Sequence, residues 1–157
     1  MATKRSKRDV VDQLIREFRV SGNLDNAFDN VAAQRLGINE TDLHCLNIIE
    51  NSGGVTAGEL AAQAGLTNGA ITGVLDRLER AGFARRVADP ADRRRVRVEV
   101  TDAFYKHAER IWGPTAADWQ STLGERFTAE ELERIAGFLR TTVEIGRRQL
   151  DRLREGR

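Results

Sequence analysis

Residues 55–86 read VTAGELAAQAGLTNGAITGVLDRLERAGFARR and contain two short helical segments separated by one glycine. Thr56 and Glu59 have the spacing of a capping box, which opens the first helix. Gly65 ends that helix, and a second one follows as far as Gly82. Its apolar residues fall on one side at helical spacing: Ile71, Val74, Leu75 and Leu78. Two short helices joined by a glycine-containing turn predict a helix-turn-helix.

The hydrophobic period changes from 3.6 to 2 after this second helix. Residues 83–88 and 95–100 alternate between two sets of side chains, as strands do. Between them, residues 89–94 read DPADRR, which favours a turn at its start and carries charge at its tip. A hairpin placed directly after the second helix is a wing, so we expect residues 38–101 to form a winged helix-turn-helix domain.

Apolar residues at helical spacing also flank this domain on both sides. Residues 9–36 form one long helix, or two if residues 21–23 (Ser-Gly-Asn) break it, and residues 40–50 form another with Asn39 as its N-cap. After residue 101 a further helix must kink or restart at Pro114, because proline lacks the amide hydrogen that the helix needs. A second capping box at residues 128–131 opens a last helix that runs to residue 155.

The last helix carries a narrow apolar seam with alternating steps of four and three residues, as in a coiled coil. The seam consists of Leu132, Ala136, Leu139, Val143, Gly146, Leu150 and Leu153. Such a seam indicates a partner helix. The predicted fold is therefore mainly α with a small β-hairpin wing. Its parts are an N-terminal dimerisation region (1–37), the winged helix-turn-helix domain (38–101) and C-terminal dimerisation helices (102–157).

Composition limits the class of protein. The chain has 157 residues, 40% hydrophobic and 31% charged, with a net charge of +1, which fits a globular domain that needs no disulfide or structural metal. No apolar run is long enough to cross a membrane, and no apolar stretch follows the basic N-terminus as in a secretory signal. A single cysteine, Cys45, fits a reducing compartment. We expect a cytoplasmic protein without membrane contact.

Charge is concentrated in the predicted hairpin. Six arginines lie between residues 85 and 97, opposed by Asp89 and Asp92. A local basic strip in a nearly neutral protein is typical of a surface that binds phosphates. A solvated hairpin without any partner explains the strip equally well, so charge alone leaves both interpretations open.

Three segments together resemble the MarR family of bacterial regulators: GINETDLHCLNII (37–49), residues 55–86, and DPADRRRVRVEVT (89–101). The Asp-Pro-x-Asp-Arg-Arg motif, preceded by Leu-Glu-Arg-x-Gly, is specific, and the resemblance covers the central half of the chain. It implies a homodimer whose N- and C-terminal helices interlock and position two winged domains on a pseudo-palindromic operator in double-stranded DNA. It also implies a recognition helix in the major groove and a wing tip in the minor groove.

The resemblance further implies which residues contact DNA. The candidates are Thr67, Asn68 and Gly69 at the start of the recognition helix, then Thr72 and Arg77, and finally Arg93 and Arg94 at the wing tip. Asp92 is expected to hold one of these two arginines in place, although a plain turn residue is the alternative. Taken singly, each candidate is more typical of a solvated surface. Gly73 departs from the family, in which an arginine often follows the threonine, so one expected contact is missing.

Many MarR-family members release DNA when a small aromatic or phenolic molecule binds. The corresponding candidates here are Phe28, His44 and Trp112, for which plain core packing is the alternative interpretation. We expect no cofactor and no metal, because no second thiol and no metal-ligand spacing accompany the two histidines. Cys45 lies among apolar neighbours and is expected to be an inert buried thiol rather than a redox sensor.

The favoured function is a sequence-specific DNA-binding transcription regulator, a repressor by analogy, released by a small aromatic effector and associated with the bacterial nucleoid when bound to DNA. A winged-helix module that binds proteins without DNA is the alternative. An enzyme ranks third, because the sequence offers no set of acid, base, nucleophile and metal ligands.

Overall fold

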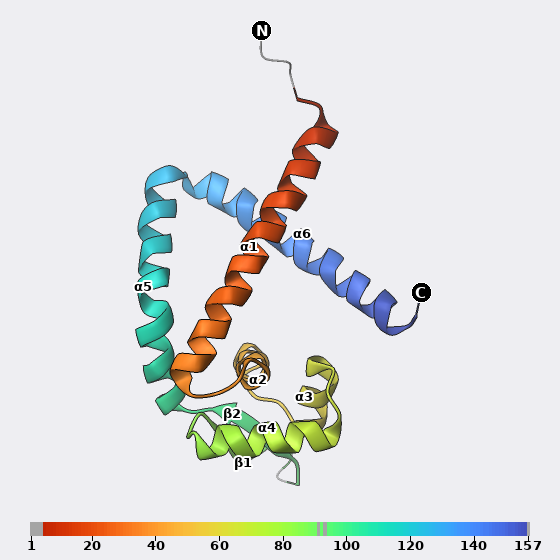
Figure 1. Ribbon diagram of the computed structural model, residues 1–157, viewed down its shortest axis with the longest axis vertical. Coiled ribbons are helices and arrows are strands. Elements are labelled where there is room, and N and C mark those ends of the chain that lie inside the picture. The colour runs from red at the N-terminus through yellow and green to blue at the C-terminus, as the bar shows by residue number, and fades with distance from the viewer. Residues whose placement is uncertain (1–4, 91, 93, 157) are drawn as a thin grey trace. The chain divides into compact units, whose positions relative to one another are not determined.

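The computed structural model describes residues 5–90, 92 and 94–156 (Figure 1). The chain forms two compact units, Met1–Glu109 and Arg110–Arg157. The elements of the first unit, in order, are α1 (Lys7–Leu36), α2 (Glu40–Asn51), α3 (Ala57–Ala64), α4 (Asn68–Arg80), β1 (Ala84–Ala88), β2 (Val96–Val100) and the start of α5 (Asp102–Arg126). The second unit contains the rest of α5 and α6 (Ala129–Arg154). A mainly helical chain with one small hairpin confirms the predicted fold class.

The helix starts follow the caps that the sequence contains. The Asn39 side chain accepts a hydrogen bond from the Asp42 amide (2.8 Å), and both predicted capping boxes are formed, at Thr56–Glu59 and at Thr128–Glu131. A third box, Ser6 with Asp9, opens α1 two residues before the predicted start. Hydrogen bonds from Thr56 lower the pKa of Glu59, so the carboxylate form of that cap is favoured.

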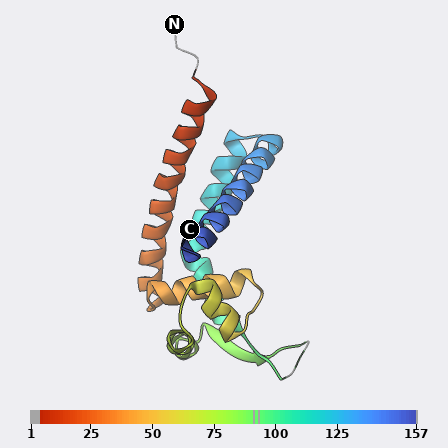
Figure 2. The ribbon, with the colours of Figure 1, turned by 90° about the vertical axis from the view of Figure 1, so that its right-hand side faces the viewer.

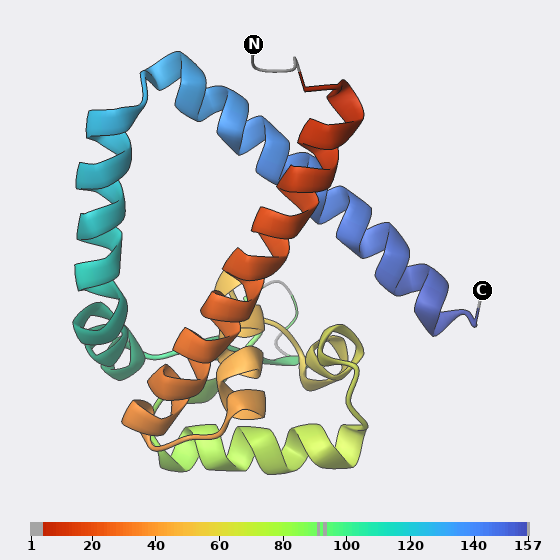
Figure 3. The same cartoon turned by 45° about the horizontal axis from the view of Figure 1, so that its top comes forward.

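Two residues that can interrupt a helix do not end one here. α1 continues through Gly22, so residues 7–36 form one helix rather than two (Figure 3). α5 likewise contains Pro114 inside a single span and does not restart there. A glycine inside a helix costs only about 1 kcal/mol relative to alanine. The other hydrogen bonds of these long helices outweigh one weak position.

The core of the first unit lies between α2, α3, α4 and β2. The predicted stripe of α4 is buried, and Leu78 has no exposed surface. The residues that share this core include Leu43, Leu46, Ile49, Leu60, Ile71, Val74, Leu75 and Val98. At its edge the rings of Phe83 and Phe104 meet edge to face at 5.9 Å. These contacts attach the hairpin and the start of α5 to the helices.

The hairpin is antiparallel, from Ala84 opposite Val100 to Ala88 opposite Val96. Its strands agree with the prediction to within a residue at each end. Val55 adds an isolated bridge to Val98, through backbone hydrogen bonds of 3.1 and 2.7 Å. Gly54 precedes this bridge with φ of 103°, and a Cβ there would lie 3.0 Å from Nη2 of Arg97, so the position requires glycine. Figure 2 shows the hairpin projecting beyond the helices of its unit.

In the second unit, the predicted seam of α6 is not covered. None of the residues of α6 is buried, and Leu139, Val143 and Leu150 are 44%, 52% and 48% exposed. α1 also carries exposed apolar side chains, among them Leu14 and Phe18. Within the described ranges, no helix combines the length and the apolar character that a membrane span requires.

Candidate nucleic-acid interface

The N-terminus of α4 brings three predicted residues together. Thr67 is the N-cap, and its Oγ1 accepts a hydrogen bond from the Ala70 amide at 3.2 Å. Asn68 and Gly69 follow as the first helical residues, and all three are exposed. The first amides of a helix have no partner within it, and this end of the helix dipole is positive. The site therefore offers donors that suit a phosphate or a base edge.

Thr72 lies one turn further along α4 and is also exposed. Its hydroxyl donates a hydrogen bond to the Asn68 carbonyl at 3.0 Å. The donor is therefore occupied within the helix, while the oxygen can still accept a hydrogen bond from outside. Because Asn68 and Thr72 are four residues apart, their side chains share one side of the helix.

Arg77 is bonded within the protein. Its Nε donates to both carboxylate oxygens of Asp42 (3.2 and 3.0 Å), and its Nη2 donates to Oδ1 at 2.7 Å. These hydrogen bonds raise the pKa of Arg77. The Asp42 side chain is 1% exposed and the Arg77 side chain 43%. Arg77 thus connects α4 to the first turn of α2, a role that sequence analysis did not identify.

A signal for this pair was present in the sequence. Asp42 stands three, four and seven residues before Cys45, Leu46 and Ile49, so it lies on the buried side of α2. A buried carboxylate requires a charged or hydrogen-bonding partner. Sequence analysis did not expect this burial, and the helical spacing could have shown it.

Most of the described hairpin arginines also have acidic partners. Arg86 bonds to both Asp76 and Glu79 of α4, which fastens β1 to that helix. The other pairs are Arg85 with Glu99 (3.5 Å), Arg95 with Glu59 (3.3 Å) and Arg97 with Asp89 (3.8 Å). Nη2 of Arg97 also donates to the carbonyls of Gly53 and Gly54, at 2.9 and 2.5 Å. Much of the basic strip therefore braces the wing against α3, α4 and the loop before α3.

At the wing tip, Arg94 is exposed and has no ion pair within the part of the chain that the structure describes. Arg93, the other predicted tip residue, lies outside the described residues. The Asp92 carboxylate accepts a hydrogen bond from the Arg94 amide at 3.0 Å, and the Asp92 amide donates to Asp89 Oδ1 at 3.2 Å. Asp92 therefore shapes the turn through the backbone of Arg94.

Comparisons with known proteins identify the family of this chain. The MarR family model matches residues 38–96. The HTH-type transcriptional regulator YcgE of Bacillus subtilis is 36% identical over 155 residues, which cover 99% of this chain and 100% of YcgE. The chain belongs to the MarR family. The family consists of transcriptional regulators that bind DNA, not enzymes.

Solved structures of this family have the same fold. A MarR family protein from Bacillus stearothermophilus superimposes with a TM-score of 0.63 at 23% identity, over 90% of this chain and 97% of that one. Wild-type MarR from E. coli, in its apo form, gives a TM-score of 0.55 at 25% identity, over 82% and 95% of the two chains. The winged helix and its flanking helices therefore follow the MarR architecture.

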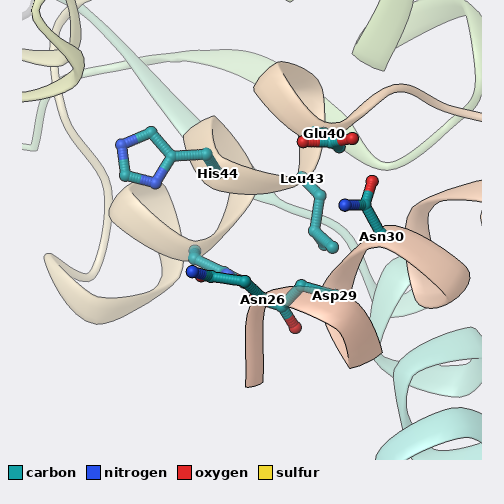
Figure 4. Close-up of a pocket in the computed structure, with 7 residues that line it drawn as sticks. Asn26, Asp29, Asn30, Glu40, Leu43 and His44 are labelled. Carbon is teal, nitrogen blue, oxygen red and sulfur yellow. The ribbon is translucent and has the colours of Figure 1, made fainter. Parts of the chain in front are cut away.

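One pocket of about 400 Å³ lies between α1 and α2. Figure 4 shows Asn26, Asp29 and Asn30 on α1 and Glu40, Leu43 and His44 on α2, with the His44 ring turned away from the α1 side chains, and Asn47 completes the lining. Of the three predicted effector residues, only His44 is among those that line this pocket. Phe28 lies on α1 and is 36% exposed, and Trp112 belongs to the second unit.

The pocket is polar rather than aromatic. Burial and the nearby charge of Asp25 raise the pKa of Asp29, and the lining residues include no lysine or arginine. Cys45 is fully buried, as predicted, and burial raises its pKa to about 11, so the thiol is protonated at neutral pH. No group of three or more potential metal ligands occurs in the described ranges.

Proposed function

We propose that this MarR-family protein is a sequence-specific repressor that binds a pseudo-palindromic operator as a homodimer. The proposal rests on the exposed start of α4, from Thr67 to Gly69, and on the hairpin that follows this helix. Arg86 of the hairpin forms an ion pair with Asp76 and so attaches the hairpin to α4. A rigid pairing of a helix end with a cationic tip suits a major groove and the adjacent minor groove. In this proposal Thr72 accepts a hydrogen bond from a base edge and Arg94 enters the minor groove.

The exposed apolar surfaces support the dimer. Leu139, Val143 and Leu150 on α6, and Leu14 and Phe18 on α1, are each more than two-fifths exposed. Exposed apolar side chains along a helix are typical of a protein–protein interface. Two subunits would present two recognition helices about one helical turn of DNA apart, the spacing that half-site recognition requires.

We also propose that the α1–α2 pocket holds a small effector that lowers DNA affinity. Its lining favours a polar ligand rich in hydrogen-bond donors over the aromatic anion that the family resemblance suggested, because Asp29 and Glu40 would repel an anion. The protein would act in the cytoplasm, at the nucleoid when it is bound to DNA. Titration of candidate ligands against the protein–DNA complex tests the effector, since a coupling of about 1–3 kcal/mol is usual for an allosteric pair.

A binding titration separates DNA recognition from the alternative of a protein-interaction module. A labelled mixed-sequence duplex is titrated with the protein by fluorescence anisotropy at several salt concentrations. For a DNA-binding protein, log affinity falls linearly as log salt rises, because each neutralised phosphate releases counterions. A module that binds only proteins shows no association with the duplex at any of these concentrations.

A further inference from the structure

Arg80 lies on the side of α4 that faces away from the core. Successive residues of a helix are about 100° apart, so Arg80 lies about 200° around the helix axis from the buried Leu78. Gly69 and Gly73 occupy nearly the same direction further toward the N-terminus. Because neither glycine carries a side chain, Arg80 is the cationic group on this ridge of the helix, about 10 Å along the axis from Gly73.

The guanidinium of Arg80 has no acidic partner among the described residues. Its Nε donates to the backbone carbonyl of Asp76 at 3.2 Å, which directs the side chain back along the helix. The two nearest carboxylates on α4, those of Asp76 and Glu79, are bonded to Arg86 of β1 instead. The charge of Arg80 is therefore left uncompensated at an exposed position.

Arg77 is also partly exposed, but its guanidinium has an acidic partner. Its Nε and Nη2 are both committed to the buried Asp42, and Nη1 lies only 3.5 Å from where a Cβ of Gly73 would stand. Withdrawing the guanidinium to reach a phosphate would leave a carboxylate that is 1% exposed without its partner. The two arginines thus have different roles, although they are only three residues apart.

We propose that Arg80 is the phosphate-binding arginine of α4, and that Arg77 is a positioning residue that fixes α4 on α2 through Asp42. This assignment rests on the proposed DNA-binding function and names a contact that sequence analysis did not. A phosphate beside Arg80 would receive the Nη donors that the Asp76 carbonyl leaves unused. Arg77 would affect binding only through the placement of the helix.

The test compares the salt dependence of duplex binding with the thermal stability of four variants: Arg80→Ala, Arg80→Lys, Arg77→Ala and Arg134→Ala. The last is the control for net charge, because Arg134 pairs with Glu130 on α6. Arg80→Ala is expected to reduce the slope of log affinity against log salt by about 0.9, the value for one lost phosphate contact on a duplex. It should keep the wild-type melting temperature, and Arg80→Lys should keep the slope. Arg77→Ala should lower the melting temperature and keep the slope.

Two results would overturn the assignment. One is a wild-type slope for Arg80→Ala, or a loss no larger than that of Arg134→Ala. The other is a flattened slope for Arg77→Ala at an unchanged melting temperature. If the wild-type protein itself shows no salt-dependent binding, the proposed function fails and the assignment fails with it. If the wild-type protein binds the duplex and Arg80→Ala keeps the wild-type slope, only the assignment of Arg80 fails.

Discussion

Asp42 and Arg77 join the first turn of α2 to α4 by three hydrogen bonds of 2.7 to 3.2 Å. Among the ion pairs of the described chain, this is the one whose carboxylate is almost completely buried. Burial makes the pair sensitive to the loss of either partner, because an unpaired buried carboxylate is far more costly than an unpaired surface charge. The orientation of α4 therefore depends on this contact.

Arg77→Ala should destabilise the protein by about 1–3 kcal/mol, the usual cost of an unsatisfied buried polar group. Adding Asp42→Ala to that variant should recover part of the loss, because the carboxylate that lacks its partner is then gone. Urea unfolding followed by circular dichroism measures both changes. Wild-type stability of Arg77→Ala would show that the pair contributes nothing to the fold.

Alkaline pH should destabilise the protein through Cys45. Its pKa in the folded chain is about 11, above the ordinary value of 9.0. Between these values the unfolded thiol loses its proton while the folded one keeps it, so stability falls as pH rises. The contribution of Cys45 is complete below pH 9.0 and is lost as pH rises through about 11. Cys45→Ala should lack this extra decline in unfolding free energy, and parallel curves for the two proteins would refute the prediction.

Arg94→Ala should flatten the salt dependence of duplex binding by about 1, since one phosphate contact is lost. Arg95→Ala is the matched control, because it removes the same charge one residue away but from an arginine that pairs with Glu59. Its slope should change less. Equal slopes for Arg94→Ala and the wild type would indicate that the wing tip does not touch DNA.

The elements that sequence analysis located correctly are those with strong local signals. Caps at Asn39, Thr56 and Thr128 and the period change after Gly82 depend on neighbouring residues alone, and they gave accurate boundaries. α1 continues through Gly22, which is the one-helix alternative, and α5 does not restart at Pro114, because one weak residue does not stop a helix whose other hydrogen bonds remain. Local patterns overstate such interruptions.

The pairing of side chains was less predictable. The hairpin arginines form ion pairs with Glu59, Asp76 and Glu79, and these carboxylates lie far away in sequence or on another element. A local sequence pattern therefore does not show which arginine is paired. Arg77 was placed on the correct helix, but its bond to Asp42 spans 35 residues. The predicted contact residues at the start of α4 came from the family resemblance, and the structure places Thr67 there as the N-cap. Their binding to DNA stays a prediction.

Charge placed in the seam of α6 should separate the dimer. Leu139→Glu with Leu150→Glu would bury unpaired carboxylates at the proposed interface, at a cost of several kcal/mol. The variant should sediment as a monomer, or unfold, and should lose specific binding. Thr141→Glu is the control, because it lies about 200° around the helix from Leu139. A folded monomer that still binds its operator at full strength would contradict the dimer.

Selection of bound sequences from a random duplex pool tests sequence-specific recognition by a dimer most directly. The wild-type protein should enrich two inverted half-sites about one helical turn apart. Thr72→Val, which removes a hydroxyl and nearly keeps the shape, should relax one position in each half-site, where discrimination is worth about 1–3 kcal/mol. We predict that the wild-type protein enriches inverted half-sites and that Thr72→Val loses selectivity at that one position. A pool that stays unenriched after repeated rounds with the wild-type protein would contradict the account.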